Sequence, residues 1–235
     1  MMYDAEFEQL AVQLAERSKI SAITISQQYG SGGNKLAAKL AFKLRWRLAD
    51  YEIIAQVARQ LGITEEEAAL YDEHTCSFVD RFLLSMMFST AEAMQAWASQ
   101  LIMPVSPQMQ KRLYHESLHQ IIDTFVCTGN TVIVGRGAQV LLANQPDLLH
   151  IRVVAPFAQR VSTVMQSERL DEAHARVCIQ QRDRNQARYL QSQYHRNVND
   201  PLLYDLVVNS GFLDLEGQID LICLALEHKA HWAVV

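Results

Sequence analysis

The sequence predicts an α/β protein whose parallel sheet carries helices on both faces. Short, continuous apolar runs recur along the chain, and such runs are typical of strands buried in a parallel sheet. Stretches whose apolar residues have helical spacing lie between them, so that strands and helices alternate. Three glycines within four residues join the first strand to the first long helix. The predicted strands are residues 22–26, 131–135, 150–155 and 205–209.

The glycine-rich turn directly follows the β-branched run that ends at Ser26. Gly30, Gly32 and Gly33 permit positive φ angles and let backbone N–H groups approach an anion. The helix that begins there directs the positive end of its dipole at the same point. We interpret the turn as a cradle for phosphate groups. On these residues alone, a turn that only links a strand to a helix is the alternative.

The turn departs from the two common phosphate-binding patterns. In the pattern G-x-x-x-x-G-K-[ST], Gly32 matches the second glycine. The first glycine then falls on Gln27, the lysine on Gly33 and the hydroxyl residue on Asn34. The dinucleotide pattern G-x-G-x-x-G also fails, because Lys35 stands where its third glycine belongs. The loop therefore offers backbone N–H groups, Lys35 and the helix dipole.

Composition and charge fit one globular protein. At 235 residues and 26.7 kDa, the chain is long enough for one large α/β domain with a subsidiary helical part. Its net charge of -5 argues against a general affinity for nucleic acid or an anionic membrane. The four cysteines are widely spaced without a C-x-x-C pair, which predicts reduced thiols. Because no secretory signal is expected in the first residues, we predict a cytoplasmic protein.

Helical spacing and capping residues predict the other elements. Thr64 and Glu67 form a capping box that begins one helix. A methionine-rich helix follows, and core or dimer packing explains its methionines better than a ligand groove does, so a homodimer is expected. The predicted helices include residues 4–19, 51–61, 78–103, 107–127 and 216–228, and two more that begin at Pro156 and Asp171.

Several arginines are candidates for phosphate binding. Arg136 lies between two glycines after a buried strand, so we expect it to point into the same crevice as the glycine turn. Arg184 and Arg188 share a helix face, which suits the grasping of a polyphosphate when a flexible segment closes. An ordinary solvated helix face is the alternative for these two residues and for Arg160.

A competing pattern points to zinc. His115, Glu116 and His119 fit H-E-x-x-H, in which two histidines one helical turn apart bind zinc and the glutamate acts as a base. No third ligand follows at the expected spacing. An exposed helix with satisfied histidines is the better interpretation, and no metal-ligating residues are assigned.

With these residues in view, the sequence resembles the cytidylate-kinase-like family of P-loop nucleoside monophosphate kinases. The matching stretches lie in the expected order across most of the chain. They are residues 23–33, 50–54, 132–137, 154–161 and 204–209. The resemblance implies a three-layer P-loop NTPase-type sheet with a helical insertion. It also implies γ-phosphoryl transfer from ATP, with Mg²⁺, to a nucleoside monophosphate, with a CMP-like acceptor.

The resemblance also implies a role for individual residues. Asp50 and Arg136 would lie on the monophosphate side, with Arg136 also catalytic. Arg182, Arg184 and Arg188 would belong to a closing lid, where Arg182 would bind substrate and the other two would be catalytic. The loop that would hold the donor phosphates comprises Tyr29, Gly30, Ser31, Gly32, Gly33, Asn34 and Lys35.

The departures from the family pattern support a second hypothesis. Many members carry Arg or Lys near the position of Gln27, and the loss of one positioned cation weakens transition-state stabilisation by several kcal/mol. A nucleotide-binding or regulatory protein that kept the fold and lost catalysis is therefore the alternative to a kinase. A zinc hydrolase is the third hypothesis.

We predict one P-loop kinase-like domain with six consecutive parts. An amino-terminal helix is followed by the phosphate loop with the first helices, and then by a helical insertion on the acceptor side. A core segment, an arginine-rich lid-like segment and the last strand with its helix complete the chain. The six parts are residues 1–19, 20–62, 63–129, 130–168, 169–203 and 204–235.

Overall fold

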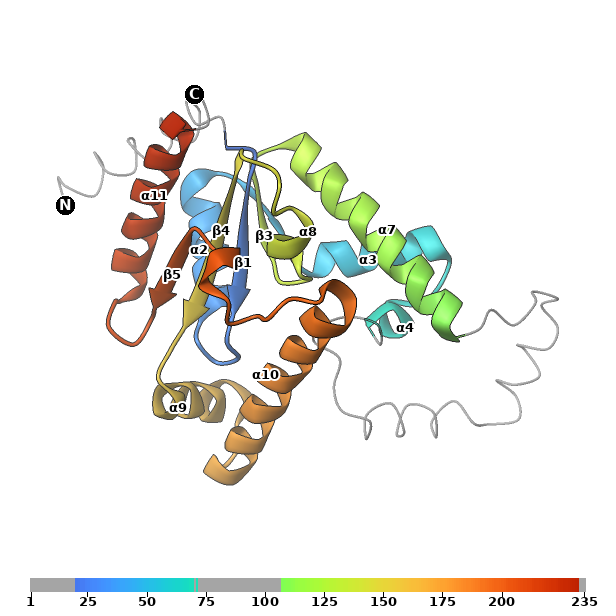
Figure 1. Cartoon of the computed structure of the whole chain (residues 1–235). Coiled ribbons are helices and arrows are strands. Elements are labelled where there is room, and N and C mark those ends of the chain that lie inside the picture. The colour runs from blue at the N-terminus through green and yellow to red at the C-terminus, as the bar shows by residue number, and fades with distance from the viewer. Residues whose placement is uncertain (1–19, 70, 72–106, 233–235) are drawn as a thin grey trace.

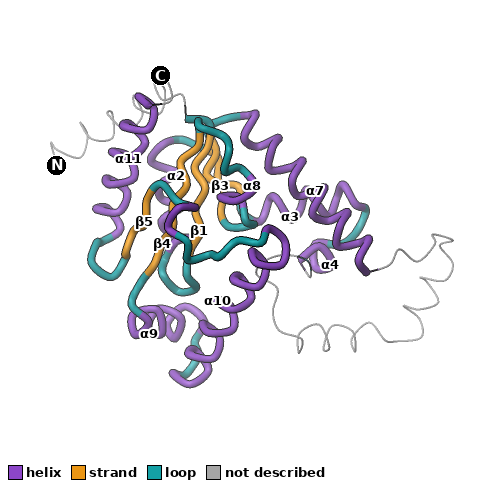
Figure 2. Tube along the Cα trace, viewed as in Figure 1, coloured by secondary structure: helices purple, strands orange, loops and turns teal. Residues whose placement is uncertain are grey.

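A five-stranded parallel sheet forms the centre of the protein (Figure 2). The computed structural model describes residues 20–69, 71 and 107–232. The strand order is β2-β3-β1-β4-β5, and every neighbouring pair is parallel, as predicted. The strands are β1 Ala22–Gln27, β2 Arg47–Ala49, β3 Thr131–Val134, β4 Leu148–Val154 and β5 Leu206–Asn209.

The helices begin and end close to their predicted positions. Thr64 Oγ1 accepts a hydrogen bond from the Glu67 N–H at 3.1 Å, and the Glu67 carboxylate accepts one from the Thr64 N–H at 2.9 Å, which confirms the capping box. Asp171 caps α10 by accepting from the His174 N–H. The helices are α2 Gly33–Leu44, α3 Tyr51–Leu61, α4 Glu65–Ala69, α7 Pro107–Thr128, α8 Ala138–Leu141, α9 Phe157–Glu168, α10 Glu172–Tyr194 and α11 Leu215–Trp232, with a 3-10 turn at Pro201–Leu203.

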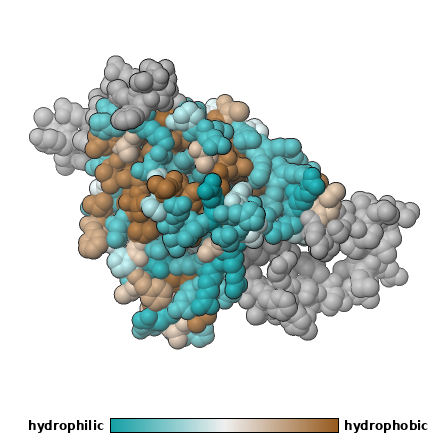
Figure 3. All heavy atoms as spheres, viewed as in Figure 1, coloured by the Kyte–Doolittle hydropathy of each residue, from teal (hydrophilic) through white to brown (hydrophobic). Residues whose placement is uncertain are grey.

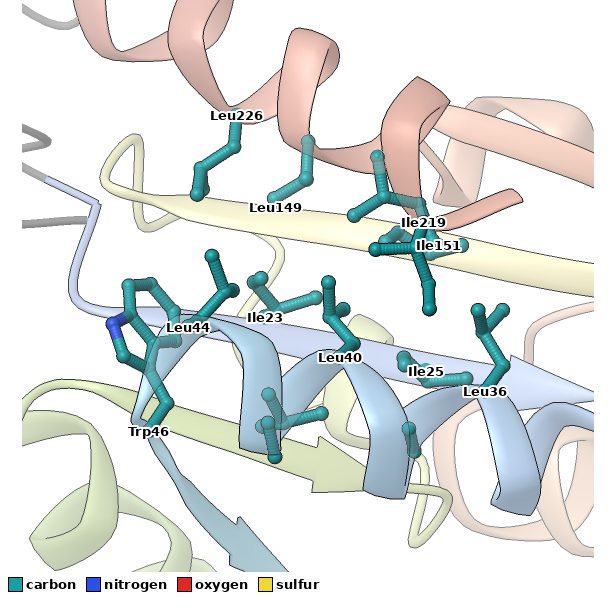
Figure 4. Close-up of a cluster of buried hydrophobic side chains, with 14 of the residues drawn as sticks. Ile23, Ile25, Leu36, Leu40, Leu44, Trp46, Leu149, Ile151, Ile219 and Leu226 are labelled. Atoms are coloured by element: carbon teal, nitrogen blue, oxygen red, sulfur yellow. The ribbon is translucent and has the colours of Figure 1, made fainter. Parts of the chain in front are cut away.

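Helices cover both faces of the sheet (Figure 1). On one face, α2 and α11 pack against the apolar side chains of β1, β3, β4 and β5, and Figure 4 shows Leu40, Ile151 and Ile219 meeting in this layer. On the other face, α3, α7 and α8 form a second apolar cluster around Ile133. The three-layer P-loop-type fold predicted from the sequence is therefore confirmed.

The side chains of β1 alternate between the two faces. Ile23 and Ile25 belong to the α2 and α11 layer, whereas Thr24 and Ser26 face the opposite side. In the register between β1 and β4, Thr24 lies beside His150 and Ser26 beside Arg152. The centre of the sheet therefore carries a short polar column on one face, which ends where the glycine loop begins.

The strand order places the glycine loop at a change of direction in the chain. From β1 the chain runs to β2 on one side, and after β3 it crosses to β4 on the other side of β1. In open α/β sheets, ligands bind beyond the carboxyl ends of the strands at such a switch point. The loop after β1 thus lies where this architecture forms a ligand site.

Some predictions concern residues that the structure does not describe. The helices predicted at residues 4–19 and 78–103, and with them the methionine-rich dimer interface, lie outside the described residues. Among the described helices, none is both long enough and apolar enough to cross a lipid bilayer.

Candidate functional site: the glycine loop and the arginines around it

The glycine loop joins β1 to α2 through two residues with left-handed backbone angles. Gly30 has a φ of 79° and Gly32 a φ of 86°, a region that favours glycine. A Cβ atom on Gly30 would also lie 2.9 Å from Val164 Cγ2 and 3.0 Å from the Arg160 carbonyl oxygen. Gly30 therefore lets the loop pack against α9. Gly32 is the N-cap residue of α2 and provides no side-chain hydrogen bond to the helix.

The side chain of Gln27 lies over the first residues of α2. A Cβ atom on Gly33 would be 2.5 Å from Gln27 Oε1 and 2.8 Å from Gln27 Cβ. Gln27 Oε1 accepts a hydrogen bond from the Asn34 N–H at 3.1 Å, while Gln27 Nε2 donates to Asn34 Oδ1. Gly33 stands where the common loop pattern has its lysine, so the Gln27 amide fills the space in which that side chain would begin.

The other predicted loop residues contribute little positive charge. Lys35 is exposed, and no hydrogen bond or ion pair of its ammonium group occurs with the described part of the chain. Ser31 is buried and its hydroxyl donates to the Val153 carbonyl at 3.3 Å, which ties the loop to β4. The loop is thus a set of backbone donors with a neutral amide over the start of the helix.

Helices α9 and α10 hold the loop from the side through Asp183. This carboxylate accepts from the Tyr29 N–H at 3.0 Å and from Arg160 Nη1 at 2.7 Å, and Arg160 Nη1 also donates to the Tyr29 carbonyl at 3.1 Å. Arg160 is buried, so it is not the solvated arginine that one alternative expected. The arrangement fixes the Tyr29 peptide between two charged side chains.

The side chain of Tyr29 makes a further link to these helices. Its hydroxyl donates to the Glu168 carboxylate, and the Arg182 guanidinium lies over its ring at 5.4 Å from the centroid. Burial, reinforced by the bond to Glu168, raises the pKa of Tyr29 well above its ordinary value. Tyr29 therefore stays neutral and acts as a contact between the loop and the lid-like segment.

Asp50 and Arg136 meet at the carboxyl ends of β2 and β3. Arg136 is 1% exposed and its Nη2 lies 3.4 Å from Asp50 Oδ1. Its φ of 62° is left-handed, as are those of the flanking Gly135 and Gly137. The Arg136 carbonyl accepts from the Tyr189 hydroxyl of α10 at 3.5 Å. The structure brings together the two residues that were expected on the acceptor side, and it joins them to α10.

The arginines of α10 lie on different faces of the helix. Arg182 reaches Tyr29, whereas Arg184 and Arg188 are exposed on the side away from the buried Gln186 and Tyr189. Figure 3 shows hydrophilic side chains gathered over α10 and hydrophobic ones over the region of β5 and α11. Within the described residues, neither Arg184 nor Arg188 forms a hydrogen bond or ion pair with the loop, so their predicted role stays a prediction.

Sequence reasoning missed Arg152 on β4. This arginine is 4% exposed, and its Nη1 donates to Ser26 Oγ at 2.6 Å and to Gln186 Oε1 at 3.0 Å. Its guanidinium also lies 5.9 Å from the centroid of the Tyr204 ring. The signal in the sequence is an arginine within a strand of otherwise apolar character, since such a residue is rarely buried without specific partners.

The H-E-x-x-H residues are engaged with neighbouring side chains. The His115 ring lies between Tyr114 and Tyr189, with centroid distances of 5.4 Å and 5.7 Å. Glu116 accepts from Arg112 at 2.7 Å, and the His119 ring stacks on Tyr194. Among the described residues, no three His, Cys, Asp or Glu side chains are grouped so that they could hold a metal ion.

A hollow of about 310 Å³ lies at the opposite end of β4 from the glycine loop. Its lining includes His150, Tyr204, Asp205 and Lys229. Burial lowers the pKa of His150 despite the nearby Asp205 carboxylate, and its Nδ1 lies 2.7 Å from Thr24 Oγ1. The glycine loop, Asp50 and Arg136 do not line this hollow.

Comparison with known proteins identifies relatives of this chain. The model of the cytidylate kinase-like family matches residues 22–211. A protein named cytidylate kinase from Archaeoglobus fulgidus is 23% identical over 208 residues, which cover 88% of this chain and 95% of that protein.

Two further similarities are narrower in what they show. A protein named uronate isomerase from Corynebacterium glutamicum is 30% identical over 134 residues, but these span 57% of this chain and only 24% of that protein. The crystal structure of an uncharacterized protein from Eubacterium ventriosum superposes with a TM-score of 0.62 at 18% identity, covering 88% of this chain and 98% of that one. The latter similarity concerns the fold alone.

Proposed function

Because the chain belongs to the cytidylate kinase-like family, we propose that it transfers the γ-phosphoryl group of ATP, with Mg²⁺, to a nucleoside monophosphate. The observation that carries this proposal is the position of the glycine loop at the switch point of the sheet, with the Asp50–Arg136 pair on the neighbouring strand ends. Phosphoryl transfer needs positioned phosphates and neutralised charge more than covalent chemistry. These two groups lie on the two sides at which a donor and an acceptor would meet.

On the donor side, the backbone N–H groups of the loop and the start of α2 would hold the phosphates of ATP. Gln27 Oε1 accepts from the Asn34 N–H, so a phosphate oxygen would take the place of this amide oxygen. The loop is therefore pre-shaped for an acceptor atom at the amino terminus of α2.

On the acceptor side, Arg136 would bind the monophosphate, for which CMP is the first candidate. Its guanidinium is fixed by Asp50 and by burial, so little side-chain freedom is lost on binding. Asp50 would keep the guanidinium oriented and would accept from a sugar or base of the acceptor.

The residues of the loop fit a magnesium ion that is coordinated mainly by the nucleotide. Mg²⁺ commonly keeps several waters and takes one or two protein ligands together with phosphate oxygens. Asn34 Oδ1 is the oxygen at the position where the usual pattern has a hydroxyl, and it would serve as that ligand. When bound, the ion would neutralise charge on the phosphates of ATP, of which the γ-phosphoryl group is transferred.

Catalytic loss within the same fold is the second candidate function. The observation that favours it is the neutral Gln27 amide in the place of a loop cation, with Gly33 and Asn34 at the lysine and hydroxyl positions. A protein of this kind would bind nucleotides and report their presence without turnover.

The test is calorimetric titration of the purified protein with ATP and Mg²⁺, followed by measurement of ADP release with CMP, UMP, AMP or dCMP. Binding with acceptor-dependent ADP release supports the kinase. ATP binding without ADP release in the presence of any of these acceptors supports the regulatory alternative. Absence of ATP binding contradicts both proposals. Arg59→Gln is a matched control, because Arg59 is an exposed arginine on α3.

A further inference from the structure

We propose that Arg152 is the phosphate-binding cation that the glycine loop itself lacks. This inference rests on the proposed function, since it concerns the same nucleotide site.

The register of the sheet places Arg152 beside the end of β1, just before the glycine loop. Arg152 is the direct neighbour of Ser26 across the β1–β4 pair, and Ser26 is one residue before Gln27. The Arg152 guanidinium contacts the Ser26 hydroxyl at 2.6 Å, so its charge lies at the carboxyl end of β1. Phosphates bound by the loop would lie beyond that same strand end.

Arg152 Nη1 donates hydrogen bonds to two neutral acceptors. One acceptor is the Ser26 hydroxyl and the other is the Gln186 amide oxygen, at 3.0 Å. A phosphate oxygen is a stronger acceptor for a guanidinium than either group, because the hydrogen bond is then assisted by charge. Gln186 belongs to α10, so a small shift of that helix would exchange the amide for a phosphate oxygen.

Within the described residues, the buried Arg160 and Arg136 each contact a carboxylate at this edge. Arg160 is bonded to Asp183 at 2.7 Å, and Arg136 faces Asp50 at 3.4 Å. The first fastens the loop to α9 and α10, and the second belongs to the acceptor side. Arg152 is the buried arginine whose place, next to the residue that precedes the loop, corresponds to the donor phosphates.

The loop explains why a cation is needed from elsewhere. Gln27 occupies the space over Gly33, so a lysine could not extend from position 33 while that side chain is there. An arginine on the adjacent strand can place its charge beneath the loop without entering this space. If Arg152 supplies this charge, an arginine at position 27 should be able to substitute for it, because the side chain at position 27 already lies over the start of α2.

The experiment compares the binding of ATP with Mg²⁺ and of adenosine to four proteins by calorimetry. They are the natural protein, Arg152→Gln, the double variant Gln27→Arg/Arg152→Gln, and the control Arg59→Gln. We expect Arg152→Gln to weaken ATP binding about tenfold to a hundredfold, because one set of charge-assisted bonds to phosphate is lost. Adenosine, which has no phosphate, should bind equally to all four, and Gln27→Arg should restore most of the ATP affinity.

The outcomes separate this inference from the proposed function. If the natural protein binds ATP and folded Arg152→Gln binds it equally well, Arg152 does not hold phosphate although the nucleotide site stands. Equal weakening of ATP and adenosine would mean that Arg152 only maintains the fold. No ATP binding by the natural protein removes the function and the inference together.

A second variant covers the case in which Arg152→Gln does not fold, as thermal unfolding would reveal. Arg152→Lys keeps the charge but cannot form the forked contacts of a guanidinium. We expect it to lose several-fold in ATP affinity with adenosine binding unchanged. Unchanged ATP affinity in this variant would overturn the proposal.

Discussion

The glycine loop and the strand ends beside it differ in the charge that they carry. The loop between β1 and α2 has neutral side chains at Gln27 and Asn34, and its one lysine, Lys35, is exposed. The neighbouring strand ends and α9 instead hold three arginines that are each less than a tenth exposed: Arg136, Arg152 and Arg160. The loop therefore offers backbone N–H donors, whereas the fixed positive charge around it comes from the sheet and from α9.

This distribution has a physical rationale. A lysine on a loop is a flexible point charge, whereas an arginine fixed by a strand and by hydrogen bonds is already oriented before a ligand arrives. Burial makes such arginines costly unless they are well bonded, so each has partners drawn from distant segments. The site therefore depends on the integrity of the sheet more than on the sequence of the loop.

The largest effect is expected for Arg136→Ala. This change removes the arginine on the acceptor side and leaves Asp50 without the guanidinium that it faces at 3.4 Å. We expect acceptor-dependent ADP release to fall by about a thousandfold, since a positioned cation contributes on the order of 3–4 kcal/mol in such sites. Steady-state kinetics with CMP as the variable substrate measure the change.

The partner in this pair supplies the control. Asp50→Asn keeps the shape of the side chain and should cost much less in turnover than Arg136→Ala. Equal losses in the two variants would show that the pair acts as a unit and would contradict a direct phosphate contact by Arg136. Circular dichroism establishes that both variants are folded.

The second prediction concerns the link between the loop and α10. Asp183→Asn weakens the bonds from Arg160 and from the Tyr29 N–H, and it leaves the buried Arg160 guanidinium without a carboxylate at 2.7 Å. We expect a loss of about 2 kcal/mol in unfolding free energy, less than for a fully buried pair because Asp183 is partly exposed. Urea denaturation measures this loss.

The same variant sharpens the comparison of the two regions. If the loop is held mainly by its own glycine geometry, Asp183→Asn should leave ATP affinity within a few-fold of that of the natural protein. A large loss of affinity would show that α10 shapes the loop through the Tyr29 peptide.

The third prediction tests the packing of Gln27 over Gly33. An added Cβ at position 33 would lie 2.5 Å from Gln27 Oε1, so Gly33→Ala must displace the Gln27 side chain. We expect a loss of about 1–2 kcal/mol, typical of a small overpacking strain. Thermal unfolding and urea denaturation give the value.

A double variant isolates the cause. In Gln27→Gly the Gln27 atoms that crowd position 33, Cβ included, are all absent. Gly33→Ala should then stabilise the protein slightly, because alanine favours a helix more than glycine does. The same sign of effect in both backgrounds would show that Gln27 does not occupy that space.

The fourth prediction uses the buried His150. Burial lowers the pKa of this histidine below its ordinary value of 6.5, although Asp205 opposes the shift and Lys229 adds to it. The unfolded chain then binds more protons than the folded one below about pH 6.5. The contribution of His150 to stability should be constant above that pH and should fall as the pH decreases through the folded pKa.

His150→Asn tests this source of pH dependence. Asparagine can still bond to Thr24, whose hydroxyl lies 2.7 Å from His150 Nδ1, but it does not titrate. The fall in unfolding free energy between pH 7 and pH 5 should therefore be smaller in the variant. An unchanged slope would assign the pH dependence to other groups, of which the half-buried His119 is the first candidate, since burial lowers its pKa too.

Most strands of the sheet could be predicted from the sequence because each has a recognisable pattern within its own few residues. The runs at β3, β4 and β5 are mainly apolar, and β1 alternates isoleucine with Thr24 and Ser26. Each strand lies close to its predicted bounds. The strand β2 was missed because it has three residues, of which Arg47 and Leu48 are exposed. Such a strand is defined by its pairing with β3 rather than by its own pattern.

The site was predicted in part for a similar reason. The glycine loop is a local signal, and the expectation that Asp50 and Arg136 lie on the same side of the site came from resemblance to a family. For Arg152 the local signal is only an arginine within a mainly apolar strand, and its partners Ser26 and Gln186 lie 126 and 34 residues away in the chain. The side chain that covers Gly33 was also beyond prediction, since only the folded loop brings Gln27 against the start of α2.

The smallest effect on stability is expected for the exposed arginines of α10. Both arginines are exposed, so Arg184→Gln and Arg188→Gln should each change the unfolding free energy by less than about 0.5 kcal/mol. Their value lies in the lid hypothesis, which predicts that turnover falls although stability does not. A closed conformation would have to rotate or shift α10 to bring these side chains toward the phosphates, because its inner face is now formed by Gln186 and Tyr189. If the double variant Arg184→Gln/Arg188→Gln turns over as fast as the natural protein, these two arginines do not contribute to catalysis. The positive charge of the site would then come from the sheet and α9 alone.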